Sequence, residues 1–88
     1  MHEASLISSL MRRIGEVAAA EGARRVTGVS VWLGALSHMS AEHFTEHFNH
    51  AAAGTLAAGA RIHVIVSEDE RHEHAQDILL ESVEVDAP

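Results

Sequence analysis

The sequence predicts a small α+β fold, in which two helices pack on one face of a three-stranded sheet. Three observations predict this class. The chain has 88 residues, enough for one small domain, so residues 1–88 are predicted to form a single domain. Two segments place apolar residues at helical spacing, and three others alternate apolar and polar residues as strands do. Their order is helix, strand, helix, strand, strand, which leaves the strand order in the sheet open.

The first helix is predicted over residues 3–21. Apolar residues recur there every three or four positions, which gives one apolar stripe along the helix. Gly22 follows, and glycine readily adopts the left-handed conformation at which helices end. The stripe comprises Leu6, Ile7, Leu10, Met11, Ile14, Val17 and Ala18.

The first strand is predicted over residues 25–33. Val29, Val31 and Leu33 alternate there with Ser30 and Trp32, as expected for a strand with one buried face. A glycine follows the last of them, so the strand is expected to end there.

The second helix is predicted over residues 40–53. Ser40 is the expected N-cap, because Glu42 follows in the first turn, where a carboxylate complements the helix dipole. Gly54 is expected to end the helix. Its apolar stripe is thin and contains Phe44, Phe48, Ala51 and Ala52.

Two further strands are predicted, over residues 61–66 and 79–85. The stretch between them, residues 68–77, is polar and charged, so we expect a short solvated loop without a core-forming residue. The predicted core draws on all five elements. Its members are Leu6, Leu10, Ile14, Val17, Val31, Leu33, Phe44, Phe48, Ile62, Val64 and Val83.

Composition excludes several classes of function. Cysteine and tyrosine are absent, which excludes thiol chemistry and cysteine-ligated metal sites. A net charge of −7 has the wrong sign for binding nucleic acid. The sequence has neither an apolar run long enough to span a membrane nor a secretion leader, so we expect a cytoplasmic protein without membrane contact. No nucleophile elbow or glycine-rich phosphate loop is present, so we expect no enzyme.

Eight histidines make metal binding the first functional question. At the N-terminus, the amine of Met1, the backbone nitrogen of His2 and the His2 imidazole can close adjacent chelate rings around one ion. The backbone nitrogen of Glu3 can supply a fourth, nearly coplanar donor. Such an all-nitrogen set favours Ni(II) or Cu(II) over zinc. The alternative is that Met-His begins the chain by chance.

Two weaker groups of histidines follow. His43, His47 and His50 share one face of the second predicted helix, within reach of one ion, although a solvated polar face is the simpler interpretation. His72 and His74 form an H-x-H pair in the charged loop, a pattern that is more often adventitious than a metal site.

Short motifs in a fixed order resemble the HypA/HybF family of nickel-insertion accessory proteins. The resemblance covers residues 1–66 and about 79–85. The motifs are Met1-His2-Glu3, Ser5-Leu6, Val26-Thr27-Gly28-Val29, Gly34-Ala35-Leu36-Ser37, and Gly54-Thr55-Leu56 before Gly59-Ala60.

The resemblance implies a function in the maturation of nickel enzymes. Members of the family deliver nickel to the large subunit of [NiFe]-hydrogenases, and sometimes to urease, together with a partner GTPase. It implies a nickel site made of the Met1 amine, the His2 side chain and the backbone at His2 and Glu3. It also implies that Glu3 influences transfer without its carboxylate being a required ligand.

The chain departs from the family pattern in two places. Family members carry a zinc-binding insert with paired CxxC motifs between the last two strands, whereas residues 67–77 here contain no cysteine, so no zinc is expected. Glu46 and His47 also occupy positions that are usually apolar or neutral in the family. The leading hypothesis is a nickel metallochaperone. The alternatives are an interaction or regulatory module that has lost metal delivery, and a histidine-rich metal buffer.

Overall fold

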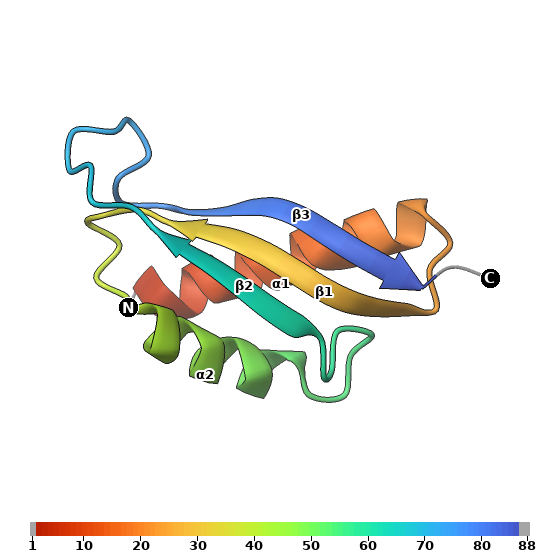
Figure 1. Cartoon of the computed structure of the whole chain (residues 1–88). Helices are drawn as coiled ribbons and strands as arrows, with labels where there is room; N and C mark the ends of the chain where they lie inside the picture. Colours follow the sequence, from red (N-terminus) through yellow and green to blue (C-terminus); the bar gives the residue numbers. More distant parts are fainter. Residues whose placement is uncertain (1, 87–88) are drawn as a thin grey trace.

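The computed structural model describes the backbone of residues 2–86 and the side chains of residues 5–86. It contains the two helices and three strands in the predicted order (Figure 1). Their bounds lie within one residue of those predicted at each end. The elements are α1 (His2–Ala20), β1 (Arg25–Leu33), α2 (Ala41–Ala52), β2 (Arg61–Val66) and β3 (Ile78–Asp86).

The sheet places β1 in the centre, in the order β2-β1-β3. β2 pairs with β1 in parallel, which the long connection through α2 makes possible. β3 pairs with the other side of β1 in the antiparallel direction. Leu33, at the end of β1, therefore lies between Val66, which ends β2, and Ile78, which begins β3. The chain must cross the end of β1 between these two residues.

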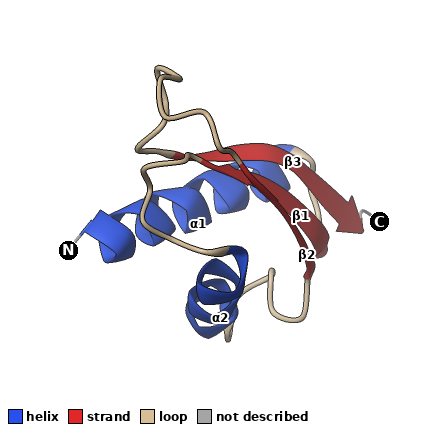
Figure 2. Cartoon of the chain, turned by 60° about the vertical axis from the view of Figure 1, so that its left-hand side comes forward, coloured by secondary structure: helices blue, strands red, loops and turns tan. Residues whose placement is uncertain are grey.

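Both helices cover the same face of the sheet, as predicted, and leave the opposite face open (Figure 2). α1 packs against β3 and α2, and α2 packs against β2. None of the helices within residues 2–86 combines the length and the apolar character needed to cross a bilayer.

The residues of α1 that enter the core differ by one position from the predicted core, which took Leu6 and Val17 from the apolar stripe instead of Ile7 and Ala18. Leu6 and Val17 are only half-buried, whereas Ile7 is 6% exposed and Ala18 is fully buried. One residue rotates a helix by about 100°, so this choice decides which edge of a broad apolar stripe faces the sheet. Leu10 lies on the stripe in both cases.

The central strand and α2 supply the deepest part of the core. Val31, Leu33, Phe44 and Phe48 are fully buried, as predicted. Ile62, Val64 and Val83 pack against this core but remain partly exposed, because they lie on the two edge strands. Several small residues complete the core, namely Ala18, Ala52, Ala57 and Ala60.

Local chemistry ends α1 and begins α2 where it was predicted. Gly22 has φ 65°, its N–H donates to the carbonyl of Ala19, and the N–H of Ala23 donates to Ala18. This pattern is a Schellman C-cap, which favours glycine. The hydroxyl of Ser40 accepts a hydrogen bond from the N–H of His43 at 3.1 Å, as an N-cap does.

The loop over residues 67–77 corrects one expectation. It was predicted to lack a core-forming residue, but Ala75 is 4% exposed. Its carbonyl accepts a hydrogen bond from the N–H of Leu36 at 2.7 Å, and the N–H of Gly34 donates to Asp77 at 2.9 Å. The loop is therefore fastened to the turn after β1, because the chain crosses the end of β1 there.

Candidate metal centre

The predicted N-terminal site lies at the start of α1. Met1 lies outside the described residues, as do the side chains of His2 and Glu3, so this ligand set stays a prediction. The backbone of His2 and Glu3 is described and belongs to the first helical turn. The first four N–H groups of a helix have no acceptor within it, so nitrogen donors at these two residues are not engaged in helical hydrogen bonds.

A hollow lies one turn further along α1. Leu6 lines it together with Leu36, Ser37 and His38 from the turn after β1. The Ser37 hydroxyl is buried without a hydrogen-bond partner in the described structure. Asp77, at the end of the 67–77 loop, also lines the hollow. The first turns of α1 thus lie against two loops that are themselves joined by hydrogen bonds.

The histidines of α2 come together as a pair. The Nε2 atoms of His43 and His47 are 2.9 Å apart, with ring centroids separated by 4.6 Å. His43 is half-buried, and His47 and His50 are exposed. Among the side chains of residues 5–86, no three histidine or acidic groups converge as a metal cluster, so His50 does not complete a three-histidine site with them.

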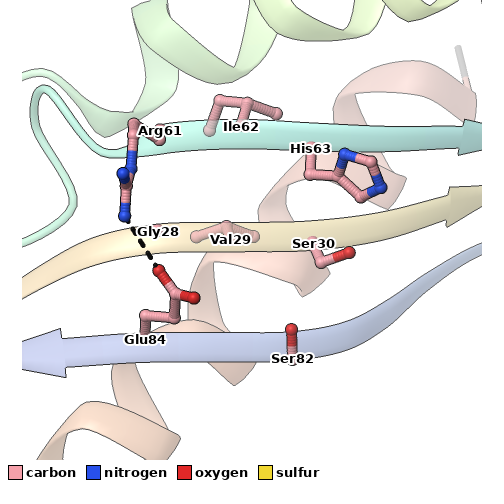
Figure 3. A pocket seen from close by; sticks show the side chains of 8 residues that line it. All are labelled: Gly28, Val29, Ser30, Arg61, Ile62, His63, Ser82 and Glu84. Atoms are coloured by element: carbon pink, nitrogen blue, oxygen red, sulfur yellow. Dashed lines mark hydrogen bonds and ion pairs between the residues drawn. The ribbon is translucent and has the colours of Figure 1, made fainter.

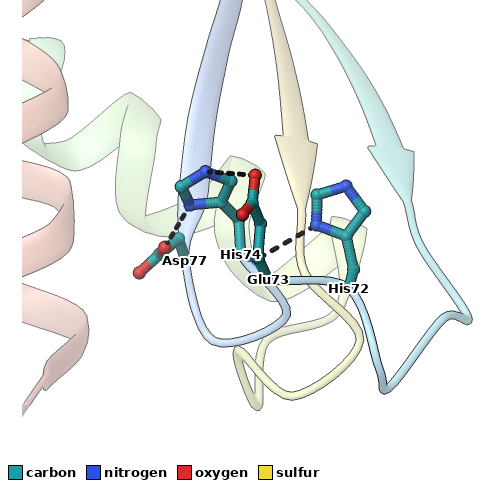
Figure 4. A network of polar contacts seen from close by, with 4 residues as sticks. All are labelled: His72, Glu73, His74 and Asp77. Atoms are coloured by element: carbon teal, nitrogen blue, oxygen red, sulfur yellow. Dashed lines mark hydrogen bonds and ion pairs between the residues drawn. The ribbon is translucent and has the colours of Figure 1, made fainter.

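The two loop histidines hold the 67–77 loop together, with their ring centroids 5.8 Å apart (Figure 4). Nδ1 of His74 lies 2.9 Å from a carboxylate oxygen of Asp77, and Nδ1 of His72 accepts the N–H of His74 at 2.9 Å. The ring of His72 packs against Trp32 at a centroid distance of 4.7 Å. Sequence reasoning missed this contact, although Trp32 is the one tryptophan of the chain and stands near the end of the adjacent strand.

The open face of the sheet carries a polar groove (Figure 3). Arg61 and Glu84 come from the two edge strands and form an ion pair at 3.2 Å. They meet above Gly28, the residue of β1 that is paired with both of them and has no side chain between them. The pair is largely exposed and contributes little to stability. His63 is exposed on the same face and does not form a cluster with other ligating groups.

Comparison with known proteins agrees with the motif order. The sequence model of the family described as "Hydrogenase/urease nickel incorporation, metallochaperone, hypA" matches residues 1–78. The hydrogenase maturation factor HypA of Klebsiella pneumoniae is 39% identical over 70 residues, which are 80% of this chain and 61% of that protein. HybF of Salmonella typhimurium is 41% identical over 64 residues, 73% of this chain and 57% of that protein. The chain thus spans about three fifths of the length of these relatives.

A solved structure shows the same fold. The solution structure of the Ni metallochaperone HypA from Helicobacter pylori aligns with a TM-score of 0.77 at 18% identity, covering 98% of each chain. At this identity the structural likeness establishes the fold alone. Together with the sequence match over residues 1–78, it leads to one assignment. The chain belongs to the HypA family of hydrogenase and urease nickel-incorporation metallochaperones.

Proposed function

We propose that this chain is a nickel metallochaperone that binds Ni(II) as cargo and passes it on during the maturation of a [NiFe]-hydrogenase or a similar nickel enzyme. The observation that carries the proposal is the family match, which begins at residue 1 and so includes Met1-His2-Glu3. The relatives from Klebsiella and Salmonella are named hydrogenase maturation factors. The function proposed is binding and transfer, not catalysis.

The proposed cargo site is the N-terminal chelate. The Met1 amine, the His2 backbone nitrogen and imidazole, and the Glu3 backbone nitrogen would surround one ion. A nitrogen-rich tetragonal site suits Ni(II) better than zinc, which prefers a tetrahedral one. The amide N–H groups of the first helical turn have no acceptor within the helix, so no helical hydrogen bond has to break to free these nitrogens for ligation. Closing the chelate rings requires only that the first few residues leave the helical conformation.

A cysteine-ligated zinc does not fit this chain. The sequence contains no cysteine, and the 67–77 loop stands where family members carry the zinc insert. Its contacts with Gly34, Leu36 and Trp32 fasten the loop by ordinary hydrogen bonds and ring packing. We therefore assign no step of nickel delivery to zinc.

The proposed partners follow from the family. They are a maturation GTPase and the hydrogenase large subunit, in the cytoplasm. Nucleic acid and membranes are not among them, because a net charge of −7 repels both phosphate backbones and anionic lipid surfaces.

Calorimetric titration with Ni(II) tests this function against its two alternatives. A metallochaperone should bind Ni(II) tightly as the wild type and lose the tight site in His2→Ala. A histidine-rich buffer using His43, His47, His50, His72 and His74 should bind equally well in both. An interaction module that has lost delivery should show no tight site in either protein. Either of the last two results would contradict the proposal.

A further inference from the structure

The outer edge of β2 offers hydrogen-bonding groups to a further strand. β2 is an edge strand, and no other strand of residues 2–86 pairs with its outer side. The N–H of Ser67, just after β2, donates to the carbonyl of Leu33 in β1 at 2.9 Å. Successive residues of a strand turn their backbone N–H and carbonyl groups to opposite sides. Those of Ile62, Val64 and Val66 therefore point away from β1, at the open edge.

This edge lacks the features that usually protect an open strand, namely lysine, proline or a bulge. β2 has the sequence RIHVIV, without lysine or proline, and its register with β1 is unbroken. The other edge strand differs, because register shifts interrupt its pairing with β1 and it carries Glu81, Glu84 and Asp86. At the end of β2, Ile65 and Val66 are 40% and 48% exposed. β2 thus has the character of a strand that can receive another.

A groove runs between this edge and α2. Ile62 and Val64 line it from the strand and are partly buried. The rest of the lining comes from one side of the helix, namely Ala41, Glu42, Thr45, Glu46 and Asn49. Glu42 and Glu46 are exposed and take part in no ion pair among the side chains of residues 5–86. The α2–β2 groove therefore joins an apolar strand side to a helix side with two free carboxylates.

We propose that the β2 edge and the α2–β2 groove bind an extended segment of a partner protein, in which basic and apolar side chains alternate. The segment adds to β2 as a fourth strand, and its backbone pairs with the outward amide groups. Its basic side chains lie on the face that α2 covers. Their apolar stems contact Ile62 and Val64, and their charged ends reach the carboxylates of α2. Its apolar side chains lie on the open face, beside Ile65.

The spacing of the two carboxylates suits this mode of binding. Four residues advance an α-helix by about 6 Å, and two residues advance a strand by about 6.6–6.8 Å. α2 runs alongside β2 (Figure 1), so Glu42 and Glu46 can each meet one of two basic side chains that stand two residues apart. Side chains at this spacing point to the same face of a strand. The match is the reason for expecting basic residues at alternate positions.

Charge favours a basic partner over a second copy of this chain. Two copies paired through β2 would bring the carboxylates of both grooves towards each other, within chains that each carry a net charge of −7. A basic segment is attracted by the same charges. Neither His43 nor His47 lines the groove, and no residue from 1–4 does. Binding there does not require the N-terminal nickel site.

The test is an NMR titration of the isotope-labelled full chain with a short capped peptide in which lysine and valine alternate. Hydrogen exchange is measured at the amides of β2. At about 90% saturation, exchange should slow about 10-fold at Ile62, Val64 and Val66, whose N–H groups become bonded to the peptide. It should stay nearly unchanged at His63 and Ile65, whose N–H groups already point to β1. This alternation identifies an added strand rather than general contact.

A pair of double variants tests the carboxylates. Glu42→Gln with Glu46→Gln should weaken binding of the peptide about 10-fold at low salt, because two ion pairs are lost. Glu16→Gln with Glu21→Gln removes the same charge from exposed positions of α1 and the turn after it. This control should change the affinity by less than about 2-fold, because distant surface charges are screened. A peptide with glutamate in place of lysine should not bind.

Several results would overturn the proposal. They are no binding of the lysine–valine peptide, equal weakening in the two double variants, and slowed exchange without the alternation along β2. If the outward amides of β2 become protected in the chain alone as its concentration rises, and sedimentation shows a dimer, the edge is occupied by a second copy and the proposal is wrong. None of these measurements uses nickel, so their outcome is separate from that of the N-terminal chelate.

Discussion

At the scale of single residues, Gly34 shows how closely the turn after β1 approaches the 67–77 loop. A Cβ atom at this position would collide with the backbone carbonyls of His74 and Ala75. Those carbonyls cannot move easily, because Ala75 is buried and its carbonyl accepts a hydrogen bond from the N–H of Leu36. Gly34→Ala should therefore lower the free energy of unfolding by about 1–3 kcal/mol, the usual cost of overpacking.

Chemical denaturation with urea measures this loss, and Gly28→Ala is the matched control. A Cβ at Gly28 would meet the carboxylate of Glu84, the end of a flexible and exposed side chain that can turn away. The ion pair that Glu84 forms with Arg61 is exposed and contributes little to the free energy of unfolding. Equal losses in the two variants would show that the loop does not press on Gly34 in solution.

At the scale of elements, α2 depends on its first turn. Ser40→Ala removes the side-chain acceptor of the His43 N–H and should cost about 1 kcal/mol. Ser82 lies exposed on β3, so Ser82→Ala should change stability by less than about 0.5 kcal/mol. Thermal unfolding followed by circular dichroism distinguishes the two. A Ser40 variant as stable as the Ser82 variant would mean that the cap does not hold the helix.

The bounds of the elements could be predicted because their signals are local. Gly22 and Ser40 act through hydrogen bonds with residues a few positions away. The rotation of α1 could not be predicted with the same accuracy, since Leu6 and Ile7 are both apolar and only the sheet decides which is buried. The burial of Ala75 depends on strand order, which the local pattern does not contain.

In the candidate sites too, contacts set by local spacing could be predicted, whereas contacts between segments distant in sequence could not. A spacing of four residues was enough to predict that His43 and His47 meet, because a helix turn sets their separation. The same spacing argument placed His50 with them, but no group of three metal-ligating side chains is found among residues 5–86. The packing of His72 on Trp32 joins a loop to a strand distant in sequence, so no local pattern could predict it.

At the scale of the whole molecule, the fold is expected to be stable without metal. Its core is built from apolar side chains of all five elements, and the 67–77 loop is fastened by backbone hydrogen bonds and ring packing. A domain whose folding depends on a metal unfolds when a chelator removes it. Adding EDTA to the purified protein should leave the thermal midpoint nearly unchanged. A large fall would show that a bound ion contributes to folding.

The proposed function depends on the N-terminus as the place where nickel is held. Its most direct test compares the native chain with a chain extended by one glycine before Met1. The extension turns the Met1 amine into an amide and moves the new amine away from His2, while residues 5–86 stay the same. His2→Ala, which removes the imidazole, is the second comparison.

The measurement is the d–d absorption of square-planar Ni(II) during a titration. The native chain should develop this band with a stoichiometry of one ion per chain, and both the extended chain and His2→Ala should lose it. If the extended chain binds nickel as tightly and with the same spectrum, the N-terminal assignment is wrong.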